Sequence, residues 1–99
     1  MSEVVLLARA EIHFHEVYAQ LAAHSFARAE RFDSVVEEAL QQLATYPRSG
    51  PESFEKYRRL LLVEFPFAIY YIIEGERIFI HALLDTRQSP ESIRRQLGC

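Results

Sequence analysis

The segment Tyr57–Arg87 constrains the fold of this chain more than any other stretch. Within it, apolar and aromatic residues alternate with arginines in the period of two that is typical of strands. The three stretches that carry this pattern are Lys56–Glu64, Phe67–Glu74 and Arg77–Leu84. Pro66 predicts a bend between the first two, because proline has no N–H to donate to a sheet. Gly75 predicts a tight hairpin turn between the last two.

The remainder of the chain predicts one further strand and three helices. Apolar runs, three- and four-residue spacing and capping residues place them at Val4–Ala8 (strand), Arg9–His24, Phe26–Tyr46 and Pro90–Leu97 (helices). Ser25 and Ser89 are the expected N-caps, and Tyr46–Glu55 is a loop rich in proline, glycine and serine. We therefore expect one α+β domain over residues 1–99 in the order β-α-α-β-β-β-α. Its helical hairpin packs on one face of a mainly antiparallel four-stranded sheet, and a short helix ends the chain.

The face of the sheet turned away from the hairpin is the predicted binding surface. We expect Ile78, Ile80, Ala82 and Leu84 to share one apolar face of the last strand, and Arg77, Phe79, His81 and Leu83 to share the other. Because no covering element is evident for the second face, we expect it to meet solvent, a partner or a substrate. Guanidinium groups there can bind phosphates or carboxylates. The predicted partner-binding residues are Arg58, Arg59, Tyr71, Arg77, Phe79, His81 and Arg87.

Several classes of function lack support in the sequence. The net charge of −3 argues against general attraction to nucleic acid. No His/Cys cluster, phosphate-binding glycine loop or nucleophile motif is present, so we expect no metal and no cofactor. The single cysteine, Cys99, is compatible with a reducing compartment. We see neither a basic-then-apolar leader nor a membrane-length apolar run, and we expect a cytoplasmic protein without a membrane partner.

Four motifs together resemble one family of small bacterial toxins. They are YRRLLL (Tyr57–Leu62), FPFAIYY (Phe65–Tyr71), IFIHALLDTRQSP (Ile78–Pro90) and the upstream PRSG loop (Pro47–Gly50). Their order is similar to that in the RelE/ParE superfamily of type II toxin–antitoxin toxins. The resemblance implies a curved sheet under a helical hairpin. It also implies a cognate antitoxin, encoded nearby, whose C-terminal part wraps the toxin in a hetero-oligomer.

The resemblance leaves the cellular target open between two branches. RelE-like members cut mRNA on the ribosome with arginines, lysines and often a C-terminal tyrosine, whereas ParE-like members poison DNA gyrase. Arg87 matches the arginine that follows the last strand in both branches. Phe67 stands where the nucleases tend to carry arginine, and no tyrosine occurs from Gln88 to Cys99. We therefore favour a ParE-like gyrase inhibitor that is not an enzyme.

Two alternatives remain at this point. The first is a ribosome-dependent endoribonuclease that uses Arg59, His81 and Arg87 to activate the 2′-OH and to stabilise the scissile phosphate. The second is an inactive module that only binds an antitoxin.

Overall fold

The computed structural model describes residues 1–99 and contains the elements in the predicted order β-α-α-β-β-β-α. The elements are β1 (Glu3–Leu6), α1 (Ala8–His24), α2 (Phe26–Thr45), β2 (Arg58–Leu61), β3 (Phe67–Glu74), β4 (Arg77–Asp85) and α3 (Pro90–Leu97). A short 3₁₀ turn, η1 (Pro47–Ser49), lies in the predicted loop. The α+β class and the element order are therefore confirmed.

The four strands form one sheet in the order β1-β4-β3-β2. The pairs β2/β3 and β3/β4 are antiparallel, and β1 pairs in parallel with β4. Gly75 at the β3–β4 turn has a φ of 63°, a conformation that glycine adopts at little cost. The mainly antiparallel sheet is thus confirmed, with its one parallel strand at an edge.

Strand β2 is shorter than the predicted Lys56–Glu64. The chain leaves the sheet after Leu61, and the Leu62 N–H donates to the Phe67 carbonyl at 2.9 Å, which closes the connection to β3. Glu64 in this connection takes a φ of 67°, a left-handed conformation that is unfavourable for a residue with a side chain. Its carboxylate accepts hydrogen bonds from Nη2 of Arg31 in α2 and from Nε of the same residue at 3.0 Å, so an ion pair holds the turn against the helix.

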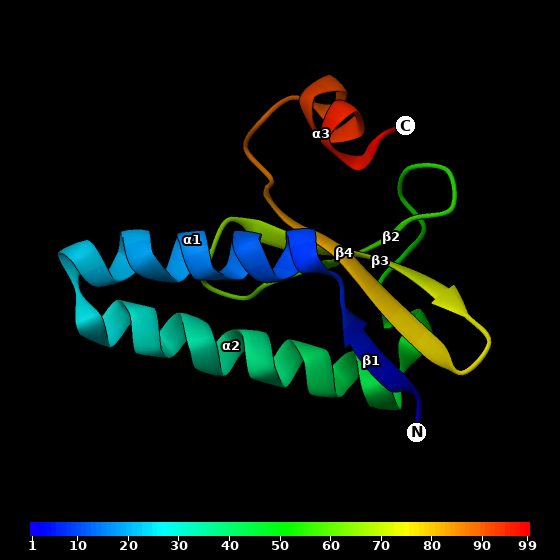
Figure 1. Cartoon of the computed structure of the whole chain (residues 1–99), viewed down its shortest axis with the longest axis horizontal. Coiled ribbons are helices and arrows are strands. Elements are labelled where there is room, and N and C mark those ends of the chain that lie inside the picture. The colour runs from blue at the N-terminus through cyan, green and yellow to red at the C-terminus, as the bar shows by residue number, and fades with distance from the viewer.

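Helices α1 and α2 form the predicted hairpin and cover one face of the sheet. The Ser25 Oγ accepts from the Arg28 N–H at 3.2 Å, which caps α2 immediately after α1 ends. Figure 1 shows the two helices running antiparallel to each other, with α3 apart from them. The buried residues between hairpin and sheet include Phe14, Phe32, Val35, Leu43, Ile69, Tyr71, Ile78 and Ile80. None of the helices has the length and apolar character needed to cross a membrane.

The opposite face of the sheet is not open, which corrects the sequence-based expectation. Helix α3 folds back over it and buries Ile93 and Leu97 in a second apolar cluster with Tyr57, Tyr70 and other sheet residues. Burying two such aliphatic side chains stabilises the docked helix by roughly 1.5–3 kcal/mol each. Ser89 caps this helix, accepting from the Ser92 N–H at 3.1 Å, and Gly98 ends it in the left-handed conformation. A terminal amphipathic helix needed an apolar surface, and the outer face of the sheet provides it.

A β-bulge in β4 makes the predicted faces of that strand wrong. Tyr71 pairs with Ile80, whereas the preceding Tyr70 pairs with Ala82, so His81 is an extra residue in the strand. Beyond His81 the alternation of side chains is reversed. Ile78, Ile80 and Leu83 therefore belong to the core under α1 and α2, whereas Ala82 and Leu84 belong to the core under α3.

Candidate functional site

The predicted binding residues fall into three groups in the structure. Arg59, Phe79 and His81 lie at or near the outer face beside α3, Arg58 and Tyr71 lie on the face turned toward the helical hairpin, and Arg77 and Arg87 lie near the two ends of β4. The sheet therefore brings only part of the predicted set together.

Tyr71 and Arg58 anchor the η1 segment to the sheet. The Tyr71 side chain is fully buried, and its hydroxyl donates to the Pro47 carbonyl at 2.7 Å and accepts from the Gly50 N–H at 3.0 Å. Burial raises the pKa of this phenol, so it stays protonated and able to donate. Arg58 donates from Nη1 to the Gly50 carbonyl at 2.8 Å and pairs with Glu52 at 3.6 Å. These contacts fix the position of the loop that precedes β2.

The outer-face strip consists of Arg59, Phe79 and His81. Arg59 is paired directly with Tyr70, and Phe79 with Ile72, which places both beside the cluster under α3. All three residues keep partial exposure. The His81 ring meets Tyr57 edge-to-face at a centroid distance of 5.2 Å. Half-exposed cationic and aromatic groups in one strip form a surface suited to contact with another macromolecule.

His81 is neutral in this strip at neutral pH. Its pKa is lowered, first by burial and then by the positive charges of Arg9 and Lys56, with Glu74 opposing them. A neutral imidazole beside a positively charged side chain can accept a proton or a hydrogen bond.

The arginines near the ends of β4 are exposed and ion-paired. Arg77 Nε lies 3.0 Å from Glu3, and both side chains are largely open to solvent. Arg87 binds Asp85 through Nε at 3.1 Å and Nη2 at 2.8 Å, and its backbone N–H donates to the same carboxylate at 2.8 Å. These hydrogen bonds hold the pKa of Asp85 below its ordinary value, so the pair persists at neutral pH.

The three residues considered for RNA cleavage make no hydrogen bond or ion pair with one another. Arg59 is on β2, His81 occupies the bulge of β4, and Arg87 follows the end of that strand with its guanidinium already engaged by Asp85. Catalysis of phosphodiester cleavage needs a base and a cation that converge on one phosphate. No cluster of His, Cys, Asp or Glu side chains has the composition and proximity to hold a metal ion.

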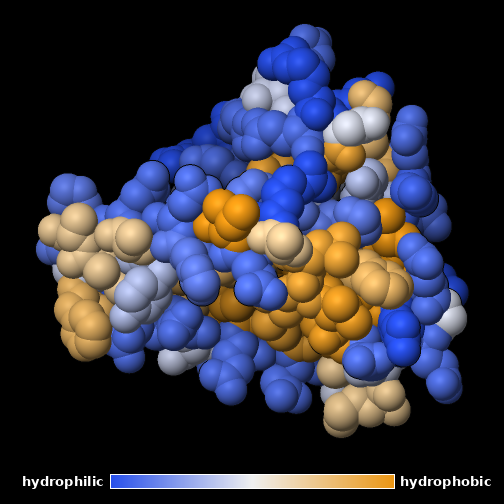
Figure 2. Space-filling model, viewed as in Figure 1, coloured by the Kyte–Doolittle hydropathy of each residue, from blue (hydrophilic) through white to orange (hydrophobic).

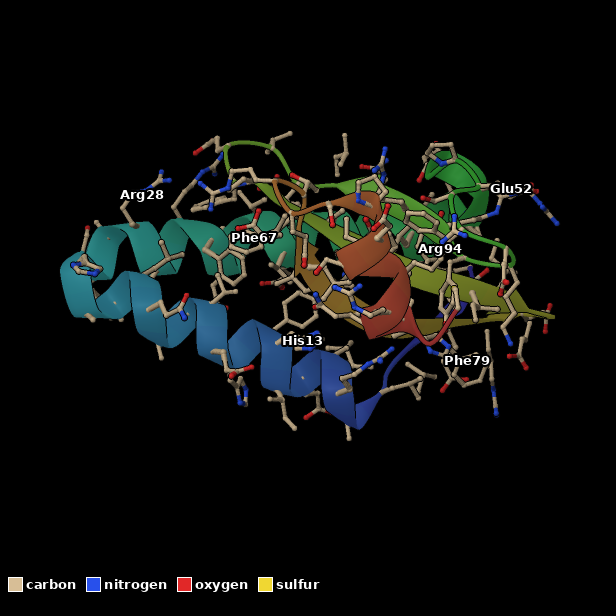
Figure 3. All side chains as sticks on the ribbon, turned by 90° about the horizontal axis from the view of Figure 1, so that it is seen from above. His13, Arg28, Glu52, Phe67, Phe79 and Arg94 are labelled. Carbon is tan, nitrogen blue, oxygen red and sulfur yellow. The ribbon has the colours of Figure 1, made fainter.

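Sequence reasoning missed a cationic and aromatic extension of this surface. Arg94 of α3 lies over the ring of Phe54 at 5.3 Å from its centroid, and Phe54 stacks on Tyr70 at 6.5 Å. Figure 3 shows Arg94 on the side of α3 that faces the loop carrying Glu52. The available signal was the four-residue spacing of Ile93 and Leu97, which gives α3 an apolar side that must be buried somewhere.

A separate apolar surface lies on the hairpin side. On the face of the molecule drawn in Figure 2, the largest hydrophobic area lies over β1 and the C-terminal half of α2. A shallow groove of about 300 Å³ there is lined by Val4 and Leu6 of β1 and by Leu40 and Ala44 of α2, with Glu37 at its border. Exposed apolar area of this kind is typical of protein–protein contact sites.

Comparisons with known proteins agree with this architecture. A solved structure described as the chromosomal ParDE TA system from P. aeruginosa matches with a TM-score of 0.77 and 18% identity, over 88% of this chain and 98% of that chain. At this identity the likeness shows the fold. No curated protein matches the chain significantly. The model of the family described as the ParE toxin of the type II toxin–antitoxin system parDE matches residues 4–90. The chain therefore belongs to the ParE toxin family.

Proposed function

We propose that this toxin stops growth by binding DNA gyrase and that a cognate antitoxin neutralises it in a hetero-oligomer. The match to the ParE family over residues 4–90 carries the proposal. The absence of the nuclease pattern at Phe67 and after Gln88 supports it, as does the engagement of Arg87 by Asp85. Gyrase acts in the cytoplasm, so the proposal requires the toxin to be in that compartment.

The proposed target-binding surface is the outer-face strip, Arg59, Phe79 and His81, with Arg77 and Arg87 at its borders. Arginine and aromatic side chains dominate the energetics of protein interfaces because they combine large contact area with directed hydrogen bonds. The Arg59 side chain has no hydrogen-bond or ionic partner within the chain and is available to an acidic group of the target. Arg58 and Tyr71 contribute indirectly, because they fix the segment that leads into β2.

A supercoiling assay with purified gyrase and purified toxin tests the proposal. We expect the wild type to inhibit, and Arg59→Ala and Phe79→Ala each to raise the half-inhibiting concentration about tenfold, as truncation of an anchor residue costs roughly 1–2 kcal/mol. Arg95→Ala is the matched control, since Arg95 is an exposed arginine of α3 outside the strip. Circular dichroism establishes that each variant is folded.

Three results would contradict this assignment in different ways. Unchanged supercoiling at micromolar wild-type toxin would remove gyrase as the target. Codon-phased mRNA cuts after induction, lost in Arg87→Ala, would establish the endoribonuclease instead. Normal growth on induction of the toxin alone would favour the inactive antitoxin-binding module.

The proposed antitoxin contact is the apolar groove between β1 and α2. It lies on the hairpin side of the sheet, whereas the outer-face strip lies on the other side, so substitutions can test the antitoxin site and the gyrase site separately. Leu40→Glu places a charge in the groove, and we expect it to weaken binding of the antitoxin encoded beside the toxin gene by more than tenfold while gyrase inhibition persists. Gln42→Glu adds the same charge at an exposed position of α2 outside this groove and is the control. Equal antitoxin affinity for the wild type and both variants would place the contact elsewhere.

A further inference from the structure

Strand β4 extends beyond its edge partner. Strand β1 pairs with Arg77–Ile80 only, and the last contact of this ladder is the Leu7 N–H donating to the Ile80 carbonyl at 3.1 Å. The chain then turns into α1, so residues 81–85 of β4 have no strand on that side. Unpaired backbone groups along such an edge need other partners or water.

Two side chains of α1 provide those partners. Arg9 donates from Nε to the His81 carbonyl at 3.1 Å, and His13 accepts the Leu83 N–H on Nδ1 at 3.2 Å. Arg9 and His13 are four residues apart, so they project from the same side of the helix. They bind backbone groups two residues apart on β4, which continues the hydrogen bonding of the sheet edge where β1 stops. Figure 3 shows His13 on the side of α1 toward the sheet.

The contact made by His13 depends on the protonation of its ring. Nδ1 accepts a hydrogen bond only when it carries no proton, whereas both nitrogens of the imidazolium are donors. A protonated His13 would direct an N–H at the N–H of Leu83 and leave this backbone donor without its partner. Arg9 also donates to the Gln96 carbonyl, so the same helix face holds α3 as well as β4.

The charged groups around His13 come from both packed elements. Arg9 and Glu16 flank it on α1, and Asp85 of β4 lines the same groove of about 380 Å³. The other polar residues of the groove, Gln20, Gln88 and Gln96, are uncharged. Burial lowers the pKa of His13 first, Arg9 lowers it further, and Glu16 opposes the shift. The ring is therefore neutral at neutral pH, as the hydrogen bond from Leu83 requires.

We propose that His13 is a pH-sensitive closure of the sheet edge, which holds Leu83 of β4 when neutral and releases the junction of α1, β4 and α3 when protonated. Because the neutral form is favoured in the folded state, the stabilisation is fully present above the ordinary histidine pKa and is lost as the pH falls through the lower folded value. The proposal rests on this geometry and is independent of the gyrase assignment.

NMR on the wild-type protein tests the first half of the proposal. At about pH 7.5, where a histidine with a lowered pKa is neutral, we expect His13 as the Nε2–H tautomer. Its titration midpoint should lie below the ordinary value for a histidine. The Leu83 amide shift should follow the His13 titration with the same midpoint. An Nδ1–H tautomer, or a Leu83 amide that does not respond to this titration, would overturn the proposal.

Hydrogen exchange on variants tests the second half. On acidification through the His13 titration, the Leu83 amide of the wild type should exchange about five- to tenfold faster after correction for the intrinsic rate, as loss of one hydrogen bond implies. In His13→Gln, where an amide oxygen can accept without titrating, this pH dependence should disappear, and His15→Gln should retain it. Equal pH dependence in both variants would show that His13 is not the switch.

Discussion

Two adjacent tyrosines of β3 permit a matched test of buried hydroxyl groups. Tyr70 and Tyr71 are both fully buried, and the strand directs them to opposite faces of the sheet. The Tyr71 hydroxyl bonds to Pro47 and Gly50, whereas the Tyr70 hydroxyl has no hydrogen-bond partner. The same substitution, tyrosine to phenylalanine, should therefore have different effects at the two positions.

Tyr71→Phe leaves the buried Gly50 N–H and the partly buried Pro47 carbonyl without this partner. Such groups cost about 1–3 kcal/mol, so we expect the free energy of unfolding to fall by about 2 kcal/mol. For a domain of this size that corresponds to a decrease in Tm of roughly 8–16 °C. Tyr70→Phe removes a hydroxyl that gains nothing in the fold, and we expect stability to stay the same or to rise by about 1 kcal/mol.

Urea denaturation followed by circular dichroism measures the free energy of unfolding of both variants and of the wild type. Equal m-values would show that the difference arises from stability and not from a change in the unfolded state. The reasoning fails if Tyr70→Phe destabilises the protein as much as Tyr71→Phe, or if Tyr71→Phe has no effect.

Three further substitutions have expected outcomes. Gly50→Ala would place its Cβ 2.7 Å from the Arg59 carbonyl oxygen, and this overpacking should lower the free energy of unfolding by about 1–3 kcal/mol in urea denaturation, although the backbone angles suit alanine. Leu97→Ala should cost about 2–4 kcal/mol in the same assay, because this side chain of α3 is buried against the sheet. A loss below about 0.5 kcal/mol, typical of surface positions, would show that α3 is not docked. Hydrogen bonds from Arg87 lower the pKa of Asp85. The stability that this pair contributes is therefore present above the ordinary carboxyl pKa and is lost as the pH falls through the lower pKa of the folded state. Stability should therefore fall less in Asp85→Asn than in the wild type between about pH 5 and pH 3, measured by urea midpoints at each pH.

Local signals in the sequence predicted the elements well because each depends on a few neighbouring residues. Ser25 and Ser89 cap helices as expected, Gly75 forms the hairpin turn, and Pro66 lies in the connection that ends β2. The resemblance carried by the strand motifs also predicted the family that the comparison over residues 4–90 established. The sequence did not predict where all of the proposed binding residues would lie, because strand alternation does not indicate which side chains bond to distant loops. Tyr71 and Arg58 make such bonds, to Pro47 and Gly50.

The amino-acid sequence by itself determined the order of elements, their caps and the apolar side of each helix, since these follow from spacing and intrinsic backbone preference. Only the tertiary structure decided that α3 covers the outer face of the sheet and that the bulge at His81 reverses the alternation in β4. It also decided that Arg9 and His13 complete the sheet edge, because they bind His81 and Leu83, which are 72 and 70 positions further along the chain. Contacts between distant segments depend on how whole faces pack and on which backbone groups remain unpaired. Neither quantity is defined until the chain has folded.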